Sequence, residues 1–210
     1  MKQLPHVADT QTKLYNAFAK AVVEFDEPLN KITVTEVTKL ANLNRRTFYT
    51  HLLDIYDLFD KMKALLGEVL EESTASFLTP EGIAKPAVIE KTIKYMSTYT
   101  PYILAVSVLD QDFFPKRICE LVQDKLTTYV QTRPEKKDVL KDHATDYHIM
   151  FISYGLGREC FYWLQDPERI SMKSLATSIF YQLSSVTVGM VDPKLIDQFI
   201  ADSNIFEQQS

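Results

Sequence analysis

The chain has 210 residues, of which 46% are hydrophobic and 24% are charged. This apolar content is enough for a sizeable core, and the low count of five glycines favours helices over a turn-rich β fold. The formal net charge of −5 excludes a protein that coats nucleic acid through uniform positive charge.

Residues 1–8 form an arm ahead of the first predicted helix, which begins at Asp9 or Thr10 and reaches about Phe25. Its apolar positions recur at helical spacing and mark one stripe: Leu14, Phe18, Ala21 and Val22. A connector at 27–30 follows. We expect this helix to brace the two short helices that come next.

Two helix start signals stand close together in the stretch 32–61. Thr33 and Glu36 have the spacing of a capping box, and Asn44 is a second N-cap candidate. Asn42 can adopt the left-handed conformation that ends a helix. The pattern predicts a helix of about two turns, a tight turn, and a second short helix over 45–52.

The second short helix has two different faces. At 100° per residue, Phe48 and Leu52 share an inward side. The outward side and its flanks carry polar or amphipathic residues: Arg46, Thr47, Tyr49 and Thr50. A short helix anchored by two apolar residues and showing these groups suits insertion into a DNA major groove.

The rest of the chain also has a helical pattern, which predicts an all-α fold. A fourth helix begins near Asp54, continues through Leu70 and is ended by residues 79–82. Further helices are predicted from Pro86, from Thr100 to about Leu109, from Phe113 to a break at Thr132, over 135–165, from Ser171 or Ser174, and from Pro193.

The helix over 135–165 is apolar nearly all round in its second half, which predicts burial on most sides. Gly155 and Gly157 cost it roughly 1 kcal/mol each against alanine. Small residues allow another helix to come close. That helix belongs either to a second copy of the chain or to the same chain, and both readings stay open.

The stretch 32–61 resembles the DNA-binding domain of the TetR family of transcriptional regulators. The resemblance covers about a quarter of the chain and rests on these matches: Thr33, Val34, Val37, Ala41, Leu43, Asn44, Thr47, Phe48, Tyr49, His51 and Leu58. Ile55 departs from the pattern, because the family usually has a phosphate-binding lysine there. Lys61 or Lys63 is a candidate replacement for that charge.

The resemblance implies a helix-turn-helix domain over 1–54 and a larger helical regulatory and dimerisation domain over 55–210. It implies a repressor that binds a near-palindromic operator in double-stranded DNA as a homodimer, with its affinity modulated by a small-molecule effector. The family's last two long helices form the dimer interface, here at 143–189. No catalytic residue set and no cofactor are expected.

The charge distribution agrees with local DNA contact. Six cations and four anions give residues 30–63 a charge of +2, on a chain whose total is −5. Candidate DNA-binding residues are Thr33, Thr35, Asn44, Arg45, Arg46, Thr47, Tyr49, Thr50 and His51. Arg46 and Thr50 are expected at base edges, and the threonines at 33 and 35 at phosphates. His51 either donates to a phosphate or packs, and both readings stay open.

Aromatic residues in the larger domain are candidates for an effector pocket: Phe113, Tyr147, Phe151 and Tyr154. The alternative is that they belong to the core and the dimer interface. His143 and His148 are five residues apart, which is not the spacing that places two metal ligands on one helical face, so no metal is expected.

We expect a cytoplasmic protein that does not bind membranes. Cys119 and Cys160 form neither a disulfide framework nor a zinc pattern. The first residues lack the apolar segment of a signal peptide, and no apolar run approaches the roughly 20 residues of a membrane span.

A second hypothesis places the chain in another functional class. A TetR-like co-activator or adaptor acts through a protein partner and has little DNA or ligand binding of its own. Ile55 and the acidic residues beside it favour this hypothesis. The run Tyr56-Asp57-Leu58 also resembles a subgroup that includes the activator of a dihydroxyacetone kinase operon.

Overall fold

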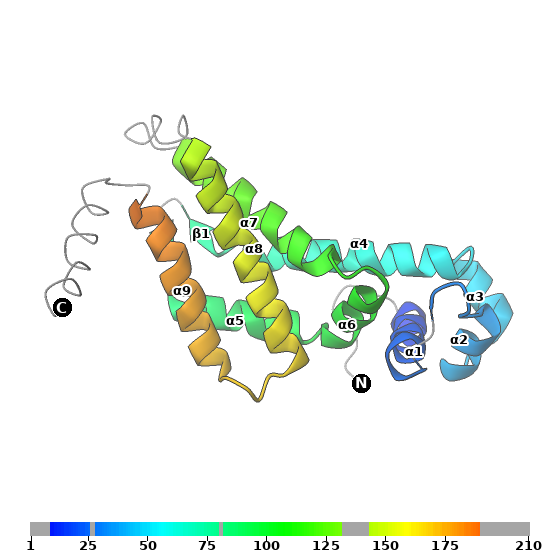
Figure 1. Cartoon of the computed structure of the whole chain (residues 1–210). Coiled ribbons are helices and arrows are strands. Elements are labelled where there is room, and N and C mark those ends of the chain that lie inside the picture. Colours follow the sequence, from blue (N-terminus) through cyan, green and yellow to red (C-terminus); the bar gives the residue numbers. More distant parts are fainter. Residues whose placement is uncertain (1–8, 26–27, 80–81, 132–142, 190–210) are drawn as a thin grey trace, which may run out of the picture. The chain divides into compact units, whose positions relative to one another are not determined.

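The computed structural model describes residues 9–25, 28–79, 82–131 and 143–189. Over these residues the chain forms nine α-helices and one short pair of strands (Figure 1). The predicted all-α fold class is confirmed. Within the same residues, no helix combines the length and the hydropathy that a membrane span requires.

The N-terminal helices are α1 (Asp9–Phe25), α2 (Val34–Leu40), α3 (Arg45–His51) and α4 (Ile55–Thr74). The predicted bounds of α1 are confirmed. Helix α4 ends earlier than the predicted stop at 79–82. An antiparallel pair of strands, β1 (Leu78–Thr79) and β2 (Gly82–Ile83), follows it instead of a plain loop.

The remaining helices are α5 (Pro86–Ser97), α6 (Thr100–Leu109), α7 (Phe113–Gln131), α8 (His143–Gln165) and α9 (Met172–Gly189). The starts predicted at Pro86, Thr100 and Phe113 are confirmed. Ser171 is the N-cap of α9, because its hydroxyl accepts a hydrogen bond from the Ser174 N–H at 3.1 Å. The predicted helix starts at 135 and 193 lie outside the described residues.

The chain divides into two compact units. The first unit comprises Met1–Glu72 and Tyr95–Arg117, and the second comprises Ser73–Lys94 and Ile118–Ser210. Helix α6 therefore belongs to the same unit as α1, α2 and α3. The predicted domain boundary after residue 54 stays a prediction.

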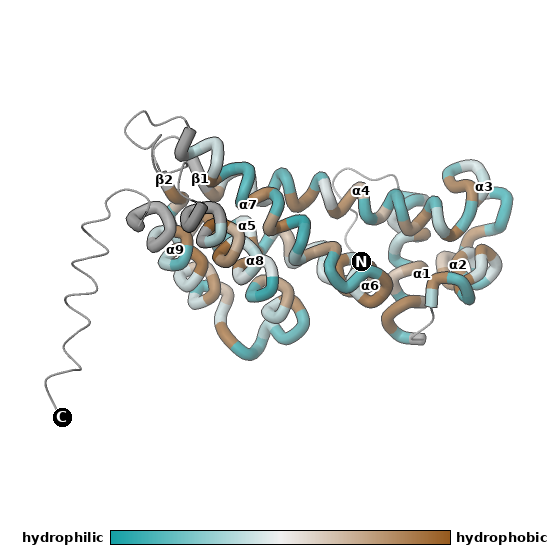
Figure 2. Tube along the Cα trace, turned by 45° about the horizontal axis from the view of Figure 1, so that its top comes forward, coloured by the Kyte–Doolittle hydropathy of each residue, from teal (hydrophilic) through white to brown (hydrophobic). Residues whose placement is uncertain are grey.

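In the first unit, α1 and α6 pack side by side (Figure 1). The α1 side chains Leu14, Phe18 and Val22 are fully buried, as their spacing predicts. Helix α6 is apolar on nearly all sides and appears largely brown in Figure 2. A hydrogen bond of 2.6 Å from the Tyr102 hydroxyl to the Asn16 side-chain oxygen joins the two helices.

In the second unit, α8 and α9 pack against each other. Leu156, Leu175 and Ile179 are buried. The Glu159 carboxylate accepts hydrogen bonds from the Ser178 hydroxyl at 2.8 Å and from the Gln182 amide at 2.6 Å. These bonds use both carboxylate oxygens and fix the two helices side by side.

Candidate nucleic-acid interface

Helix α3 begins at a strong N-cap. The Asn44 side-chain oxygen accepts hydrogen bonds from the Thr47 N–H at 2.8 Å and from the Thr47 hydroxyl at 3.0 Å. At the start of α2, the Thr33 hydroxyl accepts from the Glu36 N–H at 3.2 Å. Each cap satisfies a backbone donor that the helix itself cannot. Both predicted N-caps are confirmed.

The turn between α2 and α3 has a defined geometry. Asn42 has a φ of 53°, in the left-handed region that its sequence position predicts. The Leu43 N–H donates to the Thr38 carbonyl at 2.9 Å, and the Asn42 N–H donates to the Lys39 carbonyl at 3.2 Å. These two bonds make a Schellman motif, which ends α2 and sets the direction in which α3 leaves the turn.

Helix α3 is anchored from one side. Phe48 is 0% exposed and Leu52 is buried with it, while Val37 of α2 is also fully buried. Arg46 and Thr50 are exposed, and Tyr49 is 51% exposed. Most of the α3 tube is coloured hydrophilic in Figure 2. The helix therefore presents a polar surface on a rigid support.

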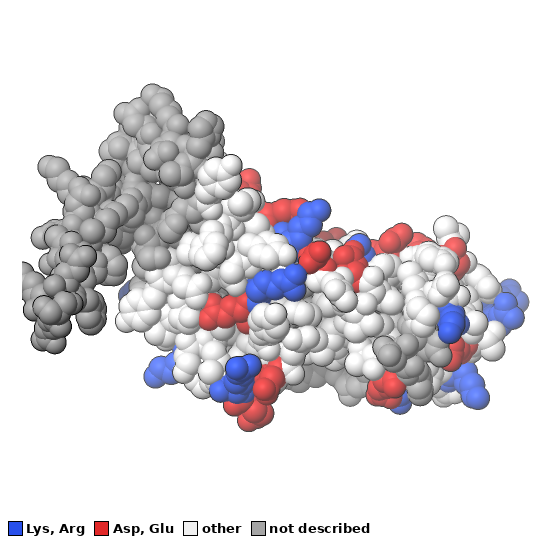
Figure 3. Space-filling model, viewed as in Figure 1, with Lys and Arg blue, Asp and Glu red and all other residues white. Residues whose placement is uncertain are grey.

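Seven of the nine predicted DNA-binding residues lie in α3 or at its N-cap, and the other two, Thr33 and Thr35, lie at the start of α2. Thr47 is half-buried, and the other eight are exposed: Thr33, Thr35, Asn44, Arg45, Arg46, Tyr49, Thr50 and His51. Lys and Arg side chains (blue) lie around α2 and α3 in Figure 3, with a few Asp and Glu side chains between them. Their contacts with DNA stay a prediction.

Two hydroxyl groups on α3 already have local partners. The Thr47 hydroxyl donates to the side-chain oxygen of Asn44, the N-cap of α3, and the Thr50 hydroxyl donates to the Thr47 carbonyl at 2.6 Å. A Thr50 hydroxyl bonded in this way still accepts hydrogen bonds through its free lone pair and keeps its methyl group available. Thr50 thus suits a base donor or a thymine methyl group, whereas Thr47 serves the cap.

Arg45 and Tyr49 are paired one turn apart on α3. The Arg45 guanidinium lies 3.5 Å from the Tyr49 hydroxyl, and its central carbon lies 6.0 Å from the centre of the Tyr49 ring. The Tyr49 ring in turn stands edge-on to Phe48, with ring centroids 5.4 Å apart. The buried Phe48 thereby limits the positions of both exposed side chains.

The corner between α3 and α4, residues 51–61, is tightly hydrogen-bonded. The Asp57 carboxylate accepts from the Leu53 N–H at 2.8 Å, and the Asp54 carboxylate accepts from the Asp57 N–H at 2.8 Å. The Lys61 ammonium donates to the Asp57 carboxylate at 3.2 Å and to the His51 carbonyl at 3.0 Å. The Leu53 bond, followed by Lys61, lowers the pKa of Asp57 below its usual range.

Sequence reasoning missed three features of this corner. Ile55 is buried, so the residue at the family's lysine position belongs to the core. Leu53 is 80% exposed and Tyr56 is 54% exposed, which makes a small apolar surface beside α3. The isoleucine itself was a signal for the first of these features, since a β-branched apolar residue at a helix start favours packing.

Lys63, the other candidate replacement for that charge, is held inside the first unit. Its ammonium donates to the Asp110 carboxylate at 2.6 Å. The same group lies 5.4 Å from the ring centre of Phe59 and 5.2 Å from that of Phe113. These contacts make Lys63 part of the support for α4 and α6.

The four predicted effector-binding residues are divided between the two units. Phe113 belongs to the first unit, where it contacts Lys63. Tyr147, Phe151 and Tyr154 lie in the second unit on α8, and each is exposed. Their role in effector binding stays a prediction.

Helix α8 has one apolar face that no described part of the same chain covers. Its exposed members recur at helical spacing: Tyr147, Met150, Phe151, Tyr154 and Tyr162. Phe151 is 74% exposed. The prediction that this helix is buried on most sides is therefore wrong for the single chain, because α9 covers only the opposite face.

Gly155 lies on this same face. A Cβ atom added there would meet nothing within 4 Å, so Gly155 does not serve close packing within the described part of the chain. An open groove of about 530 Å³ adjoins it, lined by Gly155, Arg158, Glu159, Tyr162, Trp163, Asp166, Arg169 and Ile170. The exposed face of α8 thus combines apolar side chains with a hollow.

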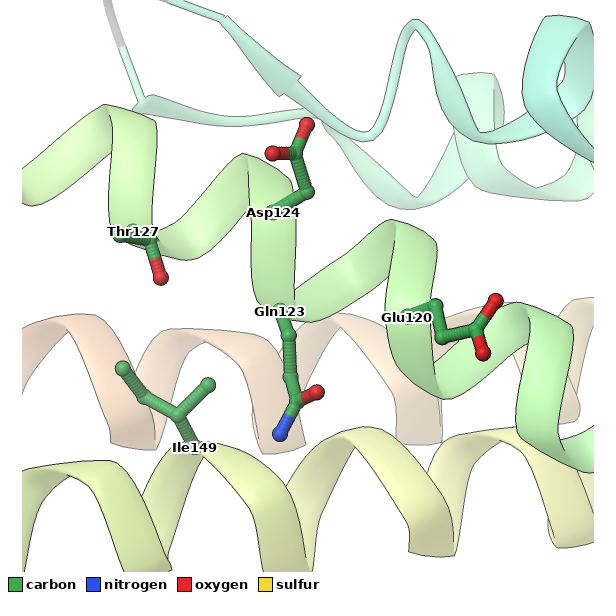
Figure 4. A pocket seen from close by; sticks show the side chains of 5 residues that line it. All are labelled: Glu120, Gln123, Asp124, Thr127 and Ile149. Atoms are coloured by element: carbon green, nitrogen blue, oxygen red, sulfur yellow. The ribbon is translucent and has the colours of Figure 1, made fainter.

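A second groove in the same unit, of about 460 Å³, lies between α7 and α8 (Figure 4). Glu120, Gln123, Asp124 and Thr127 line it from α7, and Ile149 lines it from α8. In Figure 4 the Gln123 amide points from α7 toward α8. Four of these five lining residues are polar, and two of them, Glu120 and Asp124, carry carboxylates.

The two cysteines are buried. Burial, with a smaller effect of Glu159, raises the pKa of Cys160 to about 12, so its thiol stays protonated at neutral pH. Among the described residues, no cluster of three His, Cys, Asp or Glu side chains has an arrangement that could hold a metal ion.

No family model and no curated protein matches the chain. Among solved structures, it is similar to the dihydroxyacetone kinase operon activator DhaS, with 14% identity and a TM-score of 0.56 over 86% of this chain and 97% of that one. It is also similar to the fatty acid degradation regulator FadR from Bacillus halodurans, with 11% identity and a TM-score of 0.50 over 87% of this chain and 96% of that one. The chain therefore shares its fold, over most of its length, with two regulators.

Proposed function

We propose that the chain is a TetR-like transcriptional regulator that binds a near-palindromic operator through α3. The observation that carries this proposal is α3 itself, which is capped by Asn44, anchored by Phe48 and presents Arg46, Tyr49 and Thr50 to solvent. A polar helix on a rigid support is what a major-groove contact requires. The shared fold with two named regulators agrees with it.

Seven of the eight exposed residues have a specific role in this proposal. Arg46 and Thr50 reach base edges, and Arg45, positioned by Tyr49, holds a phosphate at the rim of the groove. The threonines at 33 and 35 contact phosphates from the start of α2. Asn44 acts through the cap that fixes α3, rather than through a base.

A homodimer supplies the second half of the operator contact. The uncovered apolar face of α8 and the open space at Gly155 support pairing of two copies through this face. The dimer then has two copies of the first unit, called heads below, which are related by a two-fold axis. The two heads read two half-sites in successive major grooves. In this proposal the protein is a cytoplasmic repressor, and a small-molecule effector bound in the second unit changes the spacing of the heads.

Selection from a library of random duplex DNA tests the proposal. We expect enrichment of a two-fold symmetric sequence, with binding that weakens steeply as salt rises. Arg46→Ala should relax the preference at one position of each half-site, whereas the charge-matched control Lys91→Ala on α5 should leave it unchanged. A library that returns no enriched sequence at low salt would contradict the proposal.

A second candidate function is that of a co-activator that works through a protein partner. The exposed Leu53 and Tyr56 favour it, because apolar side chains beside α3 suit a protein surface better than a phosphate backbone. Salt dependence separates the two functions, since phosphate-driven binding falls much more steeply with salt than a protein contact does.

A further inference from the structure

Two backbone donors at the corner between α3 and α4 already have partners in the protein. N–H groups at the start of a helix are natural phosphate ligands. Here the Leu53 N–H is bonded to the Asp57 carboxylate and the Asp57 N–H to the Asp54 carboxylate, both at 2.8 Å. A DNA phosphate at this corner would compete with two of the protein's own anions.

Lys61 is the cation nearest to these carboxylates, and it is directed inward. Its ammonium lies 3.2 Å from the Asp57 carboxylate and 3.0 Å from the His51 carbonyl. That carbonyl is at the end of α3, where the helix dipole is negative. The Lys61 side chain is nevertheless 43% exposed, so it needs only to change rotamer to reach outward.

The two ends of α3 differ in charge. Around its start, the cations Lys39, Arg45 and Arg46 face the single anion Glu36, for a charge of +2. At the corner after its end, three carboxylates face one ammonium, for a charge of −2: Asp54, Asp57, Asp60 and Lys61. Because phosphates border the groove on both sides of an inserted helix, one end of α3 attracts DNA and the other repels it.

We propose that the ion pair with Asp57 keeps the Lys61 ammonium away from DNA phosphates. This internal ion pair thereby limits the phosphate contacts of each head and sets its operator affinity. The inference rests on the proposed function and adds an affinity-determining pair to it. Operator binding through α2 and α3 alone stays weak, and release of Lys61 adds one phosphate contact per head.

Salt titrations of operator binding test the pair. The probe is a fluorescently labelled duplex that carries the selected site, and the readout is the slope of log K against log salt concentration. Asp57→Asn keeps an oxygen that accepts from the Leu53 N–H but loses the charge that holds Lys61. For one added phosphate contact per head, we expect a slope steeper by about 0.9 per head and an affinity at least about tenfold higher at low salt.

Asp60→Asn is the matched control, because it removes the same charge from the same helix. Asp60 is exposed and takes part in none of the ion pairs formed by the described residues. Asp60→Asn should raise the affinity less than Asp57→Asn does and should leave the slope unchanged. Lys61→Gln alone should also leave the slope unchanged, yet in the Asp57→Asn background it should abolish the gain. Circular dichroism confirms that each variant is folded.

Equal slopes for Asp57→Asn and Asp60→Asn would overturn the inference. A shallower slope for Lys61→Gln alone would also overturn it, because Lys61 would then already contact DNA in the wild type. Either result leaves the proposed function standing if Arg46→Ala still alters site preference. Loss of all duplex binding in the wild type and in Asp57→Asn would overturn both.

Discussion

Helix α3 and helix α8 both expose aromatic side chains, but for different reasons. On α3, Tyr49 is exposed beside Arg45, Arg46 and Thr50, while the opposite face is fixed by Phe48. On α8 the exposed residues are themselves the apolar face, with Phe151 at its centre. The first surface suits a charged, polar partner, and the second suits an apolar one. The predictions below test this difference.

The largest expected effect is on the support of α3. Phe48→Ala should destabilise the first unit by about 3–5 kcal/mol, because it removes a fully buried aromatic side chain and leaves a cavity. Chemical denaturation followed by circular dichroism measures it. Tyr49→Ala, the exposed neighbour, should cost less than about 1 kcal/mol; equal losses for the two would contradict the assigned faces.

The second prediction concerns the face of α8. Phe151→Asp should weaken dimerisation at least about 30-fold, since a charge would then lie in an apolar interface in both copies. Analytical ultracentrifugation over a range of concentrations measures it. Lys91→Asp, an exposed change on α5 and outside 143–189, serves as the control. A dimer unaffected by Phe151→Asp would place the interface elsewhere.

The third prediction separates specificity from affinity within α3. Arg46→Ala should cost about 1–3 kcal/mol and relax sequence choice at one base pair of each half-site. Tyr49→Ala should weaken binding to all sites alike, because it releases Arg45 from its position. Competition binding with single-base variants of the operator distinguishes the two. Unchanged affinity and preference for Arg46→Ala would mean that another face of α3 enters the groove.

Removal of the α3 cap should have a smaller effect. Asn44→Ala should lower stability by about 1 kcal/mol, because the Thr47 N–H loses its acceptor. Asn44→Asp retains an oxygen and should restore most of the loss, with thermal unfolding as the measurement. If Asn44→Asp lost as much stability as Asn44→Ala, the side-chain amide group, and not the cap, would be what stabilises the helix.

The smallest effect is a pH dependence at the corner after α3. The folded-state pKa of Asp57 is lowered, so its ionised form stabilises the fold above the unfolded-state value near 3.8. This contribution is lost as the pH falls from about 3.8 through the lowered folded-state pKa. The free energies of unfolding of the wild type and of Asp57→Asn should differ at pH 7, and this difference should be smaller at pH 3. A constant difference would assign the effect to packing.

The N-terminal helices were predictable because their signals are local. The cap at Asn44 acts over three residues, and the left-handed turn at Asn42 is a property of one residue. The inward face of α3 follows from the spacing of Phe48 and Leu52 alone. A seven-residue helix gives less information: in α2, Leu40 is 37% exposed, whereas the polar Thr38 is buried.

Features that depend on distant residues were not predictable. The bond between Lys63 and Asp110 joins positions 47 apart, and the bond between Tyr102 and Asn16 joins positions 86 apart. Neither pair has a sequence pattern that selects the partner. The all-round apolar pattern of α8 cannot distinguish a helix covered by its own chain from one whose face is left for a second copy.

The stoichiometry of the protein on its selected duplex tests the central claim most directly. Sedimentation of the complex, combined with hydroxyl-radical footprinting, gives the number of chains per duplex and the positions that they protect. We expect two chains per duplex and two protected segments centred a whole number of helical turns apart. A single chain per duplex, or protection that does not depend on sequence, would contradict the account.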